Sequence, residues 1–231
     1  MSIFFVTGTD TDSGKTLVSS ALLWRARQMG LTTLGIKPIA SGCEQQDGGW
    51  RNRDALSLQQ QSWPQLDYAL HNPLRFPEAI APHIAAELHG QHLSVTSVEQ
   101  ALQPVLAQKA QFTLIEGAGG WYLPLNNQGQ MLSDWVAQHA WPVVLVIGLR
   151  LGCLNHASLT VSAIRQAGLS LAGWVVNHVD PDMPYQRENI ATLQATMPAP
   201  CLGRIPWLEQ ASAENAAPFL NLQSLHLVDV G

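Results

Sequence analysis

Short runs of consecutive apolar residues recur along the chain, each bounded by glycine or polar residues. Such runs are typical of strands that are buried on both faces of a parallel sheet. They predict strands at Ile3–Val6, Phe112–Ile115, Val143–Ile147 and Leu171–Val176. The first run is short and uncharged and leads directly into a glycine-rich loop, so it favours a buried strand over a signal peptide.

Segments with the apolar spacing of helices lie between these runs. They predict helices at Thr16–Met29, Asp54–Gln61, Leu132–His139, Leu154–Ala167 and Glu188–Met197. Gly30 and Gly168 follow two of them, as is common at helix ends, and a new strand is expected a few residues later. Because strand and helix alternate, the sequence predicts an α/β fold with a mostly parallel, twisted sheet and helices on both faces.

Two regions lack this alternation. Residues 39–92 are rich in Gly, Gln, Pro and His and show one convincing helix, and long loops in compact domains are usually functional. Residues 209–231 fit no clear pattern, although Leu225–Val228 is a candidate edge strand. No repeat or linker divides the chain, so we expect a single domain over residues 1–231.

Composition excludes several classes of protein. The 231 residues are 46% hydrophobic and 13% charged, which indicates a substantial core rather than disorder. The net charge is −5 and the twelve Lys and Arg are scattered, which argues against binding to nucleic acid or anionic lipid. The longest apolar stretch, Trp141–Leu149, is too short to cross a membrane, and the first apolar run does not resemble a signal peptide, so we expect a cytoplasmic protein. Cys43, Cys153 and Cys201 form no C-x-x-C pair and are expected to be buried or loop thiols.

A glycine-rich loop, Gly8–Thr16, follows the first predicted strand and opens the first predicted helix. In this context we expect backbone N–H groups to hold phosphate oxygens, Lys15 to reach the outer phosphates and the Thr16 hydroxyl group to bind Mg²⁺. Five residues separate Gly8 from Gly14, where the usual pattern has four. The alternative is a plain strand–turn–helix with an exposed lysine.

Such a nucleotide site also needs an acidic residue at a neighbouring strand end, because Mg²⁺ takes one or two protein carboxylates in addition to phosphate oxygens. Glu116 closes a predicted strand and precedes Gly117–Gly120, whose small residues let a ligand approach the backbone. Asp54 is a second candidate, although a plain helix-terminal acid explains it equally well.

Six segments occur in order along the chain. They are Gly8–Thr16, Lys37–Gly42, Arg51–Ala55, Glu116–Trp121, Gly152–Ala157 and Ile205–Leu208. Together they resemble the dethiobiotin synthetase family. The resemblance implies a P-loop NTPase-like fold and an ATP- and Mg²⁺-dependent enzyme, without biotin or another organic cofactor. Its implied activity is to carboxylate 7,8-diaminopelargonic acid with CO₂ and to close the ureido ring of dethiobiotin.

The implied reaction proceeds through a substrate carbamate and a mixed carbamic–phosphoric anhydride, from which the second amine displaces phosphate. A carbamate and a triphosphate repel each other, so positive charge is needed where they meet. The resemblance assigns that role to Lys15 and Lys37 and makes Thr11 the third catalytic residue. We expect removal of either lysine to lower the rate more than the stability.

The resemblance also implies the binding residues. Those expected to contact ATP are Asp12, Ser13, Gly14, Lys15, Thr16, Leu17, Asp54, Glu116, Gly117, Ala118, Gly119, Asn177, His178, Pro206, Trp207 and Leu208. Those expected to contact the diamine are Thr11, Asp12, Lys37 and Ser41, joined across a homodimer interface by Gly152, Cys153, Leu154 and Asn155 of the partner subunit. Those expected to gather Mg²⁺ are Thr16, Asp54 and Glu116.

Two positions depart from the family pattern. Asp12 stands where many members have Glu, which keeps the charge but shortens its reach. Asn189 stands where relatives have a tyrosine that helps to hold the substrate carboxylate, and Tyr185 is a candidate substitute for it.

Other functions remain open from the sequence alone. Asn177–Asp180 resembles the N-K-x-D motif by which GTPases read guanine, but His178 occupies its lysine position and Pro181 follows. A partitioning or carrier ATPase would carry its signature lysine at Asp10, and a cobyrinate-type amidase needs a glutaminase domain for which the chain leaves no room. A binding module without catalysis would leave the lysines and acids at the strand ends unexplained.

Overall fold

A computed structural model describes residues 1–46 and 48–225 of the chain. Its centre is a parallel six-stranded sheet with the order β10-β9-β8-β1-β7-β2, which confirms the predicted fold class. The strands are β1 (Ser2–Gly8), β2 (Thr33–Ile36), β7 (Phe112–Glu116), β8 (Val143–Leu149), β9 (Leu171–His178) and β10 (Cys201–Ile205).

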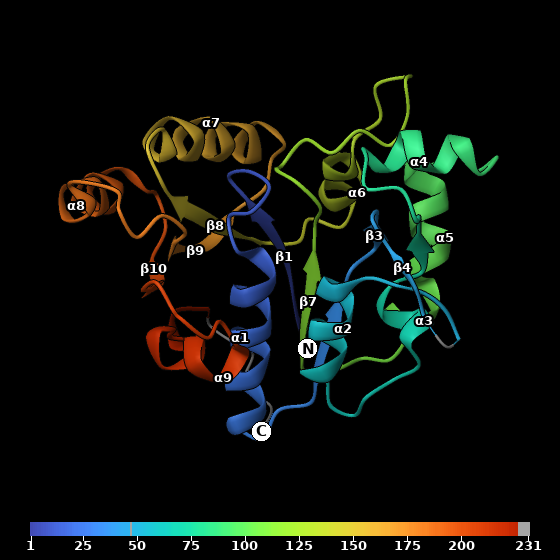
Figure 1. Cartoon of the computed structure of the whole chain (residues 1–231), viewed down its shortest axis with the longest axis horizontal. Helices are drawn as coiled ribbons and strands as arrows, with labels where there is room; N and C mark the ends of the chain where they lie inside the picture. Colours follow the sequence, from blue (N-terminus) through green and yellow to red (C-terminus); the bar gives the residue numbers. More distant parts are fainter. Residues whose placement is uncertain (47, 226–231) are drawn as a thin grey trace.

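Helices cover both faces of this sheet, and α1 runs alongside β1, between α9 and α2 (Figure 1). The longer helices are α1 (Lys15–Gln28), α2 (Arg53–Gln60), α5 (Val95–Leu106), α6 (Leu132–Gln138), α7 (Cys153–Gln166) and α8 (Gln186–Thr196). Five of these six match the predicted helices to within two residues at each end. The exception is α5, which contains Pro104 and was not predicted. The edge strand β10 was also missed, because its sequence, Cys-Leu-Gly-Arg-Ile, contains no continuous apolar run.

Alternating side chains of β1 explain the two layers. Phe4 and Val6 point to one face, where they pack with α1, Leu58 of α2 and the C-terminal segment. Phe5 points to the other face and packs with side chains that include Val98 of α5 and Trp135 of α6. Because β1 is buried on both sides, Gly8 at its end is held rigidly in the middle of the sheet.

Residues 39–92 contain more structure than the single helix that was predicted. They form two short strand pairs and two further helices: β3 (Ile39–Ala40) with β6 (Leu74–Arg75), β4 (Glu44–Gln46) with β5 (Gly49–Arg51), α3 (Tyr68–His71) and α4 (Pro82–Leu88). Each of these elements is seven residues or fewer, so no sustained periodicity marks it in the sequence.

The C-terminal segment packs on α1 through α9 (Ala213–Ala216) and the 3₁₀ turn η1 (Ala217–Phe219). Leu225 lies in the 3₁₀ turn η2 (Gln223–Leu225), so the predicted strand at Leu225–Val228 is wrong at its first residue. The remainder of that prediction lies outside the described residues.

The three thiols are unpaired, with Cys43 and Cys153 buried and Cys201 partly exposed. Among the helices of the described residues, none combines the length and the apolar character that crossing a membrane requires.

Candidate functional site

The carboxyl ends of β1, β2 and β7 meet at one edge of the sheet, where parallel α/β sheets bind their ligands. A cavity of about 300 Å³ opens there. Its lining residues are Thr11, Asp12, Gly14, Lys15, Thr16, Lys37, Ala40, Ser41, Asn52, Asp54, Ala118 and Gly119. The cavity therefore brings together residues for which the family resemblance implied separate roles in binding phosphate, metal and diamine.

The glycine-rich loop that follows β1 is held in place by its neighbours. Gly14 has φ 86°, and a side chain there would collide with Asn177, so glycine is required on both grounds. Asp12 adopts φ 57°, an uncommon conformation for a residue other than glycine. Arg150 stabilises this turn by donating a hydrogen bond to the Asp12 carbonyl (3.0 Å), and the Asn177 amide donates to the Ser13 carbonyl (3.1 Å).

Lys15 lies back along this loop, and its Nζ donates to the Asp10 carbonyl (3.1 Å). Burial and the nearby ammonium group of Lys37 lower the pKa of Lys15, and Glu116 offsets part of this effect. An incoming phosphate group would supply a countercharge and replace the Asp10 carbonyl as the partner of Lys15.

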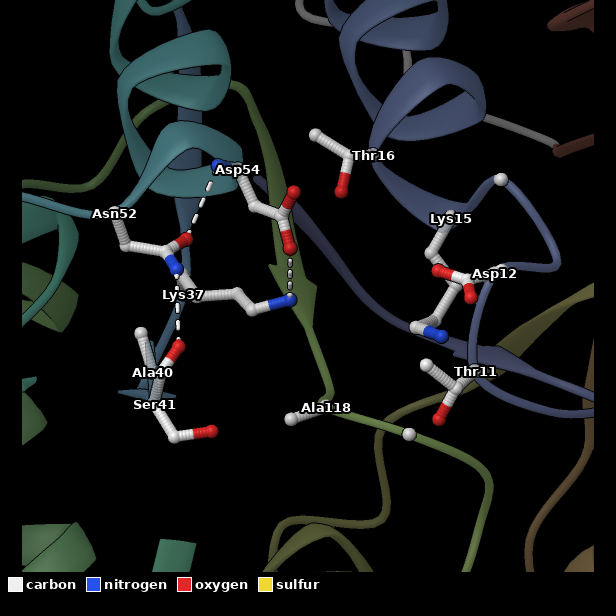
Figure 2. A pocket seen from close by; sticks show the side chains of 12 residues that line it. Thr11, Asp12, Lys15, Thr16, Lys37, Ala40, Ser41, Asn52, Asp54 and Ala118 are labelled. Atoms are coloured by element: carbon white, nitrogen blue, oxygen red, sulfur yellow. Dashed lines mark hydrogen bonds and ion pairs between the residues drawn. The ribbon is translucent and has the colours of Figure 1, made fainter. Parts of the chain in front are cut away.

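Lys37 is the most enclosed cation of the site. Its Nζ contacts Glu116 Oε1 at 2.8 Å, Asp54 Oδ2 at 3.0 Å and the Gly117 carbonyl at 3.1 Å. Burial alone would lower the pKa of Lys37, but the carboxylates of Glu116 and Asp54 raise it above its ordinary value. Lys37 is therefore a fixed positive charge at neutral pH. Figure 2 shows Lys37 and Lys15 reaching into the cavity from opposite sides.

One carboxylate oxygen of Glu116 lacks a hydrogen-bond partner. Its Oε1 accepts hydrogen bonds from Lys37 and from the Thr16 hydroxyl group (2.8 Å), whereas Oε2 is buried without a partner. A buried carboxylate oxygen without a partner is costly, and a metal ion would remove that cost. Asp54 lies beside this group with a half-exposed side chain, and Lys37 keeps the pKa of Asp54 below its ordinary value although burial opposes this.

This donor set suits Mg²⁺, which binds one or two carboxylates and takes its other ligands from water and phosphate. In the described part of the chain, no group of three or more His, Cys, Asp and Glu side chains is arranged to hold a metal ion. A cation here would therefore depend on the oxygens of a bound nucleotide.

Asn52 was not among the predicted binding residues, yet it lines the cavity and caps α2. Its side-chain oxygen accepts from the backbone N–H groups of Asp54 (3.0 Å) and Ala55 (3.3 Å), and its amide donates to the Ser41 carbonyl (3.4 Å). An asparagine immediately before a short helix is a recognisable N-cap, so the sequence did contain this signal.

Several predicted binding residues lie outside this cavity. Leu17 lines a second cavity, of about 420 Å³, which shares Thr16 with the first. Asn177 and His178 end β9, and burial lowers the pKa of His178. Other residues lie further along the same edge of the sheet, namely Pro206, Trp207 and Leu208 after β10 and Gly152, Cys153, Leu154 and Asn155 at the start of α7. Their binding roles stay predictions.

Comparison with known proteins decides the family. A model of the AAA domain family matches residues 3–215. The ATP-dependent dethiobiotin synthetase BioD of Pseudomonas aeruginosa (strain UCBPP-PA14) is 52% identical over 225 residues, which cover 97% of this chain and 98% of the relative. The chain belongs to the dethiobiotin synthetase family. Other dethiobiotin synthetases support this, including that of Cellvibrio japonicus, 52% identical over 96% of both chains, and BioD 1 of Escherichia coli (strain K12), 48% identical over 96% of this chain and 98% of the relative.

Solved structures of other proteins have a similar fold to this chain. A ParA family ATPase from Chlorobium tepidum superposes with a TM-score of 0.54 at 13% identity, covering 97% of this chain and 91% of that one. The septum site-determining protein MinD from Pyrococcus horikoshii has a TM-score of 0.51 at 18% identity, covering 98% and 90%. At these identities the likeness concerns the P-loop NTPase-like fold alone.

The buried ion pair between Lys37 and Glu116 changes the expectation that losing Lys37 would lower the rate more than the stability. Substituting Lys37→Met leaves the fully buried Glu116 carboxylate without its cation, so stability should fall together with the rate. We expect the free energy of unfolding to drop by about 3–5 kcal/mol, measured by urea denaturation.

Lys109→Met is the matched control, because Lys109 is an exposed lysine outside the site. The double variant Lys37→Met/Glu116→Leu should recover much of the lost stability, because it removes the unpaired charge. A Lys37→Met protein as stable as Lys109→Met would contradict the role assigned to this ion pair.

Proposed function

We propose that this chain is an ATP-dependent dethiobiotin synthetase, which converts 7,8-diaminopelargonic acid and CO₂ to dethiobiotin with release of ADP and phosphate. The observation that carries the proposal is the placement of Lys37. Its ammonium group is buried between Glu116 and Asp54 and faces the cavity opposite Lys15. The names and near full-length coverage of the curated relatives support the same activity.

In the proposed reaction, one amine of the diamine forms a carbamate, whose oxygen attacks the γ-phosphate of ATP. The carbamate and the triphosphate are both anionic, so their approach is unfavourable unless fixed positive charge lies between them. Lys15 from the loop and Lys37 from the end of β2 supply this charge. The second amine then attacks the mixed anhydride, closes the ring and expels phosphate.

Thr11, Asp12 and Ser41 surround the proposed diamine position. All three line the same cavity as the two lysines, and hydroxyl and carboxylate groups suit the binding of amines and of a carbamate. Asp12 is positioned by its left-handed backbone and by Arg150, which offers one way to place a side chain shorter than the family's glutamate.

We propose that Mg²⁺ is held by Thr16, Asp54 and Glu116. The unpartnered Glu116 Oε2 supports this assignment. When bound with ATP, the ion would neutralise phosphate charge that the two lysines leave unbalanced.

For the nucleotide base we propose the edge of the sheet beyond the glycine-rich loop. The Asn177 side-chain NH₂ group donates to the Ser13 carbonyl, so the Asn177 side-chain oxygen is the atom available to accept from the adenine amino group. Trp207 is 54% exposed beside Pro206 and Leu208, and an exposed aromatic ring there supports a role in bordering the base.

We further propose a cytoplasmic homodimer. Leu151, two residues before α7, is 92% exposed, and Leu159 and Tyr122 border an apolar groove of about 440 Å³. An exposed apolar groove can mark a protein interface, and this one supports the proposal. A dimer formed on this surface would bring the start of α7, a helix N-terminus suited to anions, toward the partner's bound substrate.

The residue that completes the carboxylate pocket in this dimer is proposed to be Tyr185. It is 74% exposed and adopts φ 56°, and the Asn189 side chain donates to its carbonyl at 2.9 Å. Asn189 thus stabilises the turn that presents the Tyr185 ring.

The activity is tested by phosphate release from MgATP with and without 7,8-diaminopelargonic acid and bicarbonate, and by mass spectrometry of the product. Release that requires the diamine and yields dethiobiotin is expected, with ATP preferred to GTP. Lys37→Gln should reduce the rate by about 10²–10³-fold, because a preorganised charge is lost. Release that ignores the diamine, or that occurs only with GTP, would exclude this function.

The dimer is tested by sedimentation of wild-type protein and of Leu151→Asp. We expect a dimer for the wild type and a monomer for the variant, because an aspartate buried in an apolar interface lacks a partner. Met29→Asp is the control, since Met29 is an exposed apolar residue at the C-terminal end of α1, the end away from the glycine-rich loop. A wild-type protein that sediments as a monomer while fully active would rule out a shared site.

A further inference from the structure

A buried tyrosine lies behind the catalytic cavity and joins two of its charged groups. Tyr68, in α3, is 5% exposed, and its hydroxyl group is bonded on both sides. It accepts a hydrogen bond from the backbone N–H of Asn52 (2.8 Å) and donates one to Asn72 Oδ1 (3.1 Å). Tyr68, Asn52 and Asn72 are all uncharged, so this network adds no charge of its own to the site.

One side of this network leads to Asp54. Asn52 is the N-cap of α2, so the position of its backbone fixes the start of the helix that carries Asp54. The Tyr68 hydroxyl group satisfies the N–H of this capping residue, which lies outside the helix and has no partner within it. Tyr68 therefore helps to fix the N-terminal end of α2.

The other side leads to Lys37. The Asn72 side chain donates to the Lys37 carbonyl (2.8 Å), and the Lys37 N–H donates to the His71 carbonyl (2.7 Å). The backbone of Lys37 is thus tied to the α3 segment at both of its polar groups. Asn72 has no exposed surface, so water cannot replace Tyr68 as its partner without rearrangement.

The Tyr68 ring is itself held in place. The guanidinium groups of Arg51 and Arg75 lie over it, with Cζ atoms 4.3 Å and 5.6 Å from the ring centre. Burial raises the pKa of Tyr68, so the hydroxyl group keeps the proton that it donates to Asn72. The network is therefore fully bonded and fixed at neutral pH.

We propose that Tyr68 is a positioning residue for the reaction, which sets the separation of the Asp54 carboxylate and the Lys37 ammonium group through Asn52 and Asn72. This inference rests on the proposed function, because it assigns Tyr68 to the same site. It also assigns a role to α3, whose residues support Lys37 and Asp54 from outside the cavity.

The test is a double-mutant cycle on Tyr68→Phe and Asp54→Asn. Tyr68→Phe removes one oxygen atom and leaves the ring in place. We expect it to lower kcat about 10-fold with a KM for ATP within about 2-fold of wild type, because a misplaced charge acts mainly in the transition state. Thr196→Val, which also removes one hydroxyl group, from an exposed residue at the end of α8, should leave both parameters unchanged.

If Tyr68 acts by setting the separation of Asp54 and Lys37, its effect should be much smaller in the Asp54→Asn background, where this ion pair is already broken. Purely structural damage by Tyr68→Phe would instead multiply with the effect of Asp54→Asn, and additive free energies would overturn the proposal. Unchanged kcat in Tyr68→Phe would overturn it as well.

A binding measurement separates this inference from the activity itself. Mn²⁺, titrated by electron paramagnetic resonance in the presence of ADP, should bind at least several-fold more weakly to Tyr68→Phe than to wild type. Equal Mn²⁺ binding in the two proteins would overturn the proposal.

If Tyr68→Phe does not fold, Asn72→Leu tests the Lys37 side of the network by the same Mn²⁺ titration and by the KM and kcat for ATP. A fall in kcat at constant KM is again expected, and unchanged values would overturn the proposal. Wild-type protein that lacks diamine-dependent phosphate release would refute the proposed function, whereas an active wild type with an unaffected Tyr68→Phe would refute this inference alone.

Discussion

The contact between Lys37 and Glu116 is the interaction on which the rest of the site depends. Both side chains are removed from water, and two isolated buried charges would be strongly unfavourable. They are tolerable because Lys37 is also bonded to Asp54 and to the Gly117 carbonyl, while Glu116 accepts from Thr16. Three strand ends must therefore be in register before the charges are satisfied.

This arrangement explains how a small site can bring anions together. The Lys37 cation is fixed before any ligand arrives, so the proposed approach of carbamate and phosphate would need no reorganisation of this charge. The Glu116 oxygen without a partner leaves a place for further positive charge, and Lys15 can exchange the Asp10 carbonyl for phosphate. The resting structure thus holds its charges in balance and can accept a nucleotide with its cation.

The positions of Lys15 and Glu116 can be anticipated from the sequence because Glu116 ends one strand and Lys15 follows the glycine-rich loop at the end of another. Apolar runs locate β1 and β7, and from them Lys15 and Glu116 follow. The supports of the site are less visible, because Tyr68 and Asn72 belong to a short helix and its cap, without periodicity, and contact residues 16 and 35 positions away. Arg150 was missed for a similar reason, since it reaches the glycine-rich loop across 138 positions. Such contacts depend on the tertiary fold rather than on local pattern.

The most direct test of this account is the effect of Mg²⁺ on ATP affinity, measured by calorimetry for wild-type protein and Glu116→Gln. Glutamine keeps the size of the side chain but removes the charge that Mg²⁺ would share with Lys37. The account predicts that Mg²⁺ tightens ATP binding at least about 10-fold in the wild type and has little effect in the variant. A Glu116→Gln protein with the full Mg²⁺ enhancement would contradict the central role of this carboxylate.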